Sequence, residues 1–151
     1  MSVVFVEASG PAPPELCWER YAVPAAWPGW APQIRAVVVE GAGRAPAGAV
    51  AGAGGRRGPG APGRTRIVPG LRGRVRPLAG PAVRFLVTAV DESERTWSWR
   101  VGIGPWRLNL DHGVDACLDG GTSTWVRITG PAPLPHAYAP LARAALRHLV
   151  R

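Results

Sequence analysis

The sequence predicts one α+β domain in which a seven-stranded antiparallel sheet wraps around a long C-terminal helix, with two short helices after the first strand. Three observations predict this class of fold. A β-branched apolar run near the N-terminus precedes a proline-flanked helical segment. The second half of the chain alternates polar and apolar residues with the period of a strand, and the last segment has apolar residues at helical spacing. The length of 151 residues fits a single domain, 1–151.

The first 40 residues predict a strand, a helix, a broken helical turn and a second strand. Residues 2–8 are apolar and β-branched, as in a strand. Residues 11–24 begin with paired prolines, which suit a helix start, and Pro24 ends the helix. The prolines within 24–32 remove backbone donors at four-residue intervals and leave only a broken turn. Residues 34–40 again have the pattern of a strand.

The next segment differs sharply in composition. Residues 41–63 are almost entirely glycine, alanine and proline. Such a segment cannot bury enough apolar surface to offset the entropy of ordering it, so we expect a flexible insertion at about 41–68 between two strands. Its glycines do not predict a phosphate-binding loop, because the strand and helix that flank such a loop are missing from the pattern.

The rest of the chain predicts five more strands and the terminal helix. Short polar turns separate the strands, which span residues 71–77, 82–91, 95–103, 105–117 and 122–130. Residues 136–151 have Tyr138, Leu141, Ala145 and Leu149 at the spacing of one helical face, which we expect to be buried.

The composition limits the cellular context and the partners. The formal net charge of +8 comes from 18 arginines without any lysine, and the arginine usage is typical of a GC-rich genome, which makes nucleic acid an unlikely partner. Arg72, Arg74 and Arg76 form an outward ladder, either a solvated face or one that attracts phosphates. The N-terminus predicts neither a signal peptide nor a membrane span. Cys17 and Cys117 are expected to be free thiols of a cytoplasmic protein, and no metal-ligand spacing occurs.

The predicted element order is that of the helix-grip fold, and three stretches also resemble a known family. Residues 12–34 (APPELCWERYAVPAAWPGWAPQI), the hairpin 82–103 (AVRFLVTAVDESERTWSWRVGI) and the strand pair within 110–131 (LDHGVDAC and GGTSTWVRITGP) resemble the START-like (SRPBCC) superfamily, in particular its bacterial polyketide cyclase/dehydrase group. The resemblance implies a Bet v 1-like helix-grip fold with an internal cavity between the sheet and the helix. The insertion at 41–68 departs from the family pattern.

The resemblance also implies which residues contact a ligand. Aromatic and apolar side chains in phase on the strands would line the cavity, and they are Phe85, Trp97, Trp99, Trp106, Leu108, Leu110 and His112. Trp27 and Trp30 would lie at its mouth, with Arg35 at the rim, although the two tryptophans can equally serve as core packing. Tyr138 would place a hydroxyl at the cavity. Aromatic walls with few polar groups suit a flat hydrophobic ligand.

Two functions remain open for such a cavity. The first is binding of a small hydrophobic ligand, aromatic, polyketide-like or lipid-like, without a cofactor, by a monomer or homodimer. The alternative is a polyketide cyclase/dehydrase of secondary metabolism, with His112 and Tyr21 as candidate catalytic residues. An unperturbed histidine titrates at about pH 6.5 and could exchange protons near neutrality. His112 and Tyr21 can equally have a structural role. A third hypothesis, which does not involve the cavity, is a basic nucleic-acid-binding protein.

Overall fold

The structure, a computed structural model, describes residues 1–40 and 65–151. Most of the predicted insertion, 41–64, therefore lies outside the described residues. The elements follow the chain as β1 (Ser2–Gly10), α1 (Pro14–Ala22), the 3₁₀ helix η1 (Pro24–Ala26), α2 (Trp27–Trp30), β2 (Ile34–Val39), β3 (Arg72–Pro77), β4 (Val83–Asp91), β5 (Thr96–Ile103), β6 (Trp106–Ala116), β7 (Thr122–Gly130) and α3 (Leu134–Leu149).

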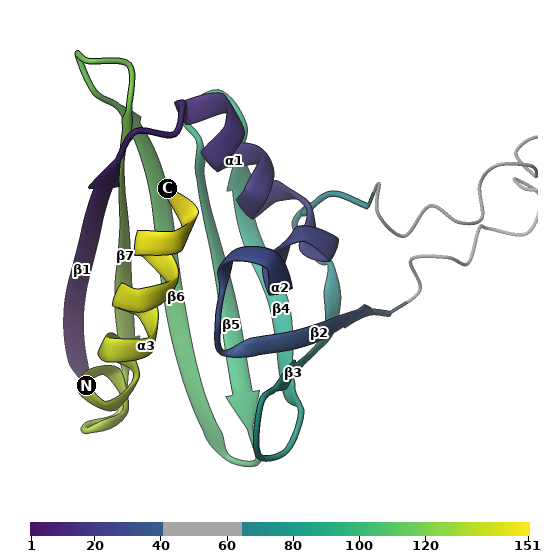
Figure 1. The fold of residues 1–151 in the computed structure, drawn as a ribbon. Coiled ribbons are helices and arrows are strands. Elements are labelled where there is room, and N and C mark those ends of the chain that lie inside the picture. The colour runs from purple at the N-terminus through teal and green to yellow at the C-terminus, as the bar shows by residue number, and fades with distance from the viewer. Residues whose placement is uncertain (41–64) are drawn as a thin grey trace, which may run out of the picture.

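The strands form one seven-stranded sheet with the order β1-β7-β6-β5-β4-β3-β2 (Figure 1). Every neighbouring pair is antiparallel. Strands β2 to β7 follow one another as a meander, and β1 pairs with β7 as the edge strand at the other end of the sheet. The seven-stranded antiparallel sheet and the C-terminal helix confirm the predicted fold class.

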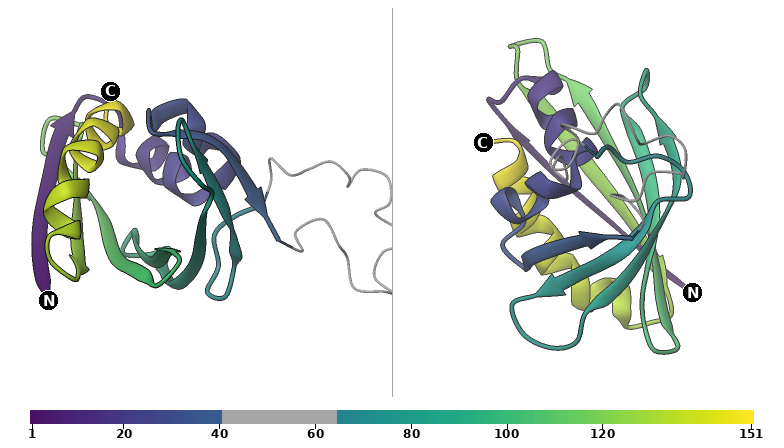
Figure 2. Two further views of the ribbon diagram at one scale, coloured as in Figure 1. Left: turned by 90° about the horizontal axis from the view of Figure 1, so that it is seen from below. Right: turned by 90° about the vertical axis from the view of Figure 1, so that its right-hand side faces the viewer.

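The sheet is strongly curved, and helices cover its concave side. Seen from below, α3 lies along the β1 and β7 side of the trough, whereas α1 and α2 lie across its other side (Figure 2). The alternation of each strand sends one set of side chains into this trough and the other set outward. In β4, for example, Phe85 and Val87 are buried and Arg84 is exposed.

Helix α3 packs on the sheet through small residues. Its buried stripe consists of Pro135, Ala139, Ala142, Ala145, Leu146 and Leu149. Leu141, which the sequence placed on the buried face, is 46% exposed, so that prediction is wrong. The helix is rotated toward its alanines because their short side chains let the backbone approach the sheet.

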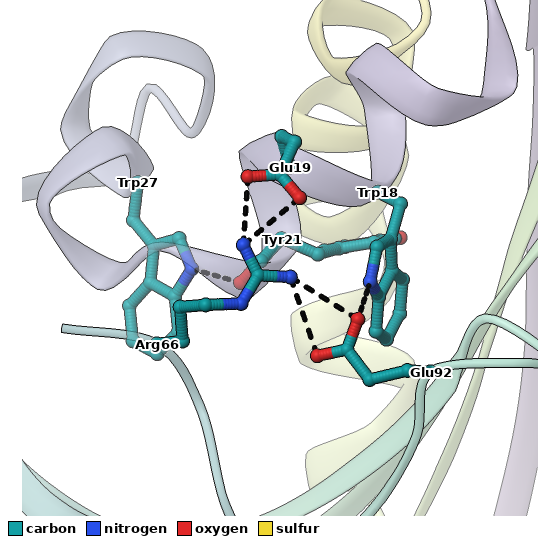
Figure 3. A network of polar contacts seen from close by, with 6 residues as sticks. All are labelled: Trp18, Glu19, Tyr21, Trp27, Arg66 and Glu92. Carbon is teal, nitrogen blue, oxygen red and sulfur yellow. Dashed lines mark hydrogen bonds and ion pairs between the residues drawn. The ribbon is translucent and has the colours of Figure 1, made fainter. Parts of the chain in front are cut away.

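The segment before β3 packs on the domain. Ile67 is 1% exposed, and its backbone N–H donates to the carbonyl of Ala22. Arg66 lies between Glu19 of α1 and Glu92 of the β4–β5 turn, with Nη–Oε distances of 2.7 and 3.1 Å (Figure 3). Glu92 also accepts a hydrogen bond from Trp18 Nε1 at 2.7 Å. Arg66 and Ile67 therefore pack on the domain, although the predicted insertion extended to residue 68.

None of the helices in the described part of the chain is long and apolar enough to cross a membrane.

Candidate ligand cavity

A small, partly open cavity lies between the sheet, α2 and α3. It has a volume of about 40 Å³. Its walls come from the α1–α2 region, from β5, β6 and β7 and from α3, and include Tyr21, Trp27, Trp30, Gln33, Trp97, Trp99, Leu110, His112, Val126, Tyr138 and Leu146. Seven of the predicted ligand contacts and the candidate Tyr21 thus gather around one space, although they come from sequence positions more than a hundred residues apart.

Aromatic rings fill most of the trough and explain the small volume. Trp27 stacks on Trp97 with ring centroids 5.7 Å apart and contacts Trp99 edge to face at 4.9 Å. Phe85 packs against Trp27 at 5.5 Å, behind the cavity wall. Pockets for drug-sized ligands measure about 300–1,000 Å³. A ligand larger than a few atoms therefore requires these rings to move.

The two tryptophans of the WPGW turn have different positions. Trp27 is 1% exposed, and its Nε1 donates to the carbonyl oxygen of Tyr21 at 2.9 Å. Trp30 lines the cavity and is half-buried, and its Nε1 donates to the carbonyl oxygen of Arg20 at 2.9 Å. Both indoles thus satisfy carbonyls at the end of α1, where the helix leaves them without internal partners. Trp27 is a core residue, whereas Trp30 is a half-buried residue of the cavity wall.

Three buried polar atoms around the cavity have no hydrogen-bond partner within the described part of the chain. They are Trp97 Nε1, Trp99 Nε1 and Gln33 Oε1, and all three residues line the cavity. A buried donor or acceptor without a partner costs about 1–3 kcal/mol. The cavity wall therefore holds two donors and one acceptor that a molecule entering between these side chains could satisfy.

Gln33 and Tyr138 form a polar pair on the helical side of the cavity. Gln33 Nε2 donates to the Tyr138 hydroxyl oxygen at 3.0 Å. Burial raises the pKa of Tyr138, so the hydroxyl keeps its proton at neutral pH. Because that oxygen acts as acceptor toward Gln33, its proton is left to donate to a ligand. Sequence reasoning missed Gln33, whose only signal is its place in the WPGWAPQI segment.

His112 lies in the cavity wall as a neutral ring. It stacks on Trp97 with ring centroids 4.3 Å apart, and its Nδ1 lies 3.4 Å from the carbonyl oxygen of Trp97. Burial lowers its pKa to about 3, against a smaller opposing effect of that carbonyl. The expected titration near pH 6.5 is therefore wrong for the folded protein, and His112 is a weak base there.

Tyr21 is fully buried and its hydroxyl proton is already used. The Tyr21 hydroxyl lies 2.8 Å from Thr124 Oγ1, and Thr124 Oγ1 donates to the carbonyl oxygen of Gly113 at 2.8 Å. Since the threonine has a single proton, Tyr21 is the donor in the first bond. Burial raises the pKa of Tyr21. These two hydrogen bonds anchor α1 to the sheet and leave Tyr21 without a free proton to transfer.

Four predicted contacts lie away from the cavity. Trp106 is 55% exposed at the β5–β6 hairpin, and Leu108 is partly buried beside the core. Arg35 is exposed on β2 and lies with Arg76 at a depression of the outer surface. Phe85 packs behind Trp27. The described residues contain no group of three or more side chains arranged to hold a metal ion.

Solved structures of other proteins share this fold at low sequence identity. Ara h 8.0201 is 17% identical with a TM-score of 0.62, over 98% of this chain and 94% of that one. BexL, a di-domain ARO/CYC from the BE-7585A biosynthetic pathway, is 15% identical with a TM-score of 0.70, over 99% of this chain and 45% of BexL. DynU16, a protein in the dynemicin biosynthetic locus, is 16% identical with a TM-score of 0.63, over 99% of this chain and 47% of DynU16.

No family model and no curated protein matches the sequence. The structural likenesses define the class: the chain has the Bet v 1-like helix-grip fold. The helix-grip fold that the resemblance implied is therefore confirmed.

Proposed function

We propose that the protein binds a small, flat, hydrophobic molecule that carries at least one carbonyl or similar acceptor oxygen. The observation that carries this proposal is the set of unpartnered polar atoms in the aromatic cavity, Trp97 Nε1, Trp99 Nε1 and Gln33 Oε1. A ligand acceptor facing the indole N–H groups would remove two desolvation costs at once. A hydroxyl on the ligand could donate to Gln33 Oε1.

The present volume of about 40 Å³ holds one or two waters, which can satisfy these atoms in the resting protein. An entering ligand would replace those waters and exchange ring–ring contacts for ring–ligand contacts. Trp30 is half-buried, unlike the fully buried rings of Trp27 and Trp97, so its displacement would open the space at a smaller cost in core packing than theirs.

Two probes of equal shape test the proposal. 2-Acetylnaphthalene carries a carbonyl where 2-ethylnaphthalene carries a methylene, so only the former can accept a bond from an indole N–H. We expect saturable quenching of tryptophan fluorescence, with a Kd in the range of about 1–100 μM and a preference of about tenfold for the ketone.

Variants assign that preference to the cavity. Trp99→Phe keeps an aromatic ring and removes the N–H, so the preference for the ketone should fall toward unity. Trp106→Phe, at the exposed hairpin, is the matched control and should leave both affinities unchanged. Equal affinity for the two probes in the unmodified protein, or no saturable binding of either, would contradict the proposal.

A polyketide cyclase/dehydrase is the second candidate, and the likeness to BexL favours it. Two of the candidate groups are poorly suited to proton transfer. His112 is a poor base, and the hydroxyl proton of Tyr21 is donated to Thr124. The remaining proton donor is Tyr138, so Tyr138→Phe should reduce any cyclisation or dehydration about a hundredfold. Turnover of a poly-β-ketone model substrate that Tyr138→Phe abolishes would favour the enzyme over the binding protein.

A further inference from the structure

A second depression lies on the outer face of the sheet, away from the aromatic cavity. It has a volume of about 250 Å³, and four arginines line it, one from each of the adjacent strands β3 to β6 (Figure 1). These are Arg72, Arg84, Arg100 and Arg107, with Leu86 and Gly102 between them.

The strand register explains why the four arginines meet. Leu86 of β4 pairs with Arg72 on one side and with Arg100 on the other. Gly102 of β5 pairs with Arg84 on one side and with Arg107 on the other. Two rows of the sheet thus each place two arginines around a central uncharged residue. The rows are two residues apart, about 7 Å along the strands.

Gly102 makes room for one guanidinium. A Cβ at this position would lie 2.8 Å from Arg107 Nη1. Without a side chain at 102, Arg107 lies over the strand, where its Nη1 donates to the carbonyl oxygen of Gly104 at 2.9 Å. Arg100 Nε is held by Asn109 Oδ1 at 3.4 Å. Two of the four charges are therefore positioned by the protein itself.

No carboxylate neutralises this cluster in the described part of the chain. The ion pairs recorded there involve Arg66 and Arg127 only. Asp111, on the same face, is held by Arg127 at 3.0 Å and by Ser98 at 2.6 Å. Residues 41–64 contain arginines but no aspartate or glutamate, so they supply no counter-charge either.

Repulsion between two arginines also destabilises the sheet next to the depression. Arg74 of β3 pairs directly with Arg84 of β4. Like charges directly opposite on one face destabilise an antiparallel pair. An anion bound beside Arg84 would offset part of this repulsion, so anion binding here would gain more free energy than at a neutral surface.

We propose that this depression, the arginine site (Arg72, Arg84, Arg100 and Arg107), binds the di- or triphosphate group of a small molecule. Guanidinium groups recognise phosphate by paired hydrogen bonds. A single phosphate group carries only about two negative charges at neutral pH. Four guanidiniums around one depression match the three to four negative charges of a diphosphate or triphosphate. The site is independent of the ligand in the aromatic cavity.

Calorimetric titration of the full chain with tripolyphosphate at low ionic strength tests the arginine site. We expect one saturable site, with inorganic phosphate at least about tenfold weaker. Arg84→Gln and Arg100→Gln should each weaken tripolyphosphate binding about tenfold or more. Arg143→Gln, which removes an exposed charge from α3, should change the affinity by less than about twofold.

Folding and ligand source are controlled in the same experiment. Arg84→Gln relieves the repulsion with Arg74, so its melting temperature without ligand should not fall. ATP binding tighter than tripolyphosphate would support a nucleotide, and equal affinity would support recognition of the phosphate chain alone. The proposal is overturned if tripolyphosphate shows no saturable binding, if Arg143→Gln weakens it equally, or if only a single-stranded oligonucleotide binds this face.

Discussion

At the scale of single residues, His112 should make the stability of the protein depend on pH. Burial lowers its pKa in the folded state to about 3, whereas an unfolded chain binds a proton at about pH 6.5. As pH falls below 6.5, the unfolded state takes up a proton that the folded state refuses. Stability from this group is therefore complete above pH 6.5 and is lost as pH falls toward 3.

The loss amounts to about 1.4 kcal/mol per pH unit, or about 2 kcal/mol at pH 5. Urea unfolding at pH 7.5 and pH 5 measures it, with His112→Phe as the reference, because phenylalanine keeps the ring on Trp97 and cannot titrate. The unmodified protein should lose about 2 kcal/mol more than the variant over this range. Equal losses would mean that His112 accepts a proton in the folded state.

The sequence predicts the orientation of His112 but not its environment. The alternation of β6 correctly predicts that His112 is directed into the trough with Leu110. Its pKa is lowered by burial, and the rings that bury it include Tyr21 of α1, which contacts it from a distant part of the chain and which no local pattern connects with it. Gln33 lies in the turn between α2 and β2, where the sequence has no helical or strand periodicity, so its position at the cavity could not be predicted.

At the scale of elements, Arg66 should hold the start of the β3 segment on α1 (Figure 3). Its side chain is 38% exposed, so solvent screens both ion pairs and the expected contribution is modest. Arg66→Ala should cost about 1 kcal/mol in the free energy of unfolding, and about 1 M NaCl should reduce that cost. Arg143→Ala, an exposed arginine of α3, provides the control and should cost less than about 0.5 kcal/mol. A salt-independent cost would show that Arg66 acts through packing of its stem.

Elements differed in how well the sequence predicted them. Strand β3 follows directly from two-residue alternation, because it has one buried and one exposed face, whereas β1 was predicted from its apolar, β-branched composition. Helix α3 was predicted with one wrong member of its buried face, Leu141, whereas Ala145 and Leu149 are buried as predicted. Its alanines are uninformative about burial by themselves, and the exposed Leu141 outweighs them in any pattern of hydrophobicity. Only the close approach to β1 and β7 selects the alanine stripe.

At the scale of the whole molecule, the trough of the curved sheet can either contain a large cavity or be filled by side chains. In this protein, tryptophan side chains fill most of it. The element order predicts the trough, but the volume left inside depends on side-chain packing among Trp27, Trp97 and Trp99, which come from distant parts of the chain. Filling the trough stabilises the fold, since buried aromatic rings contribute strongly to core energetics. Ligand binding must recover the packing energy that the moving rings lose.

Trp27→Ala should separate these two effects. Removing this fully buried ring should lower the free energy of unfolding by about 3–5 kcal/mol, as measured by urea unfolding. The same change leaves an apolar void beside Trp97 and Trp99, so 2-ethylnaphthalene should bind the variant more tightly than the unmodified protein. At a concentration 100 times its Kd, the probe should restore about 2.7 kcal/mol of the loss. Trp106→Ala, an exposed tryptophan, should lose little stability and gain no affinity. A destabilised Trp27→Ala protein that the probe cannot stabilise would mean that the trough collapses rather than opens, and that the rings are core packing alone.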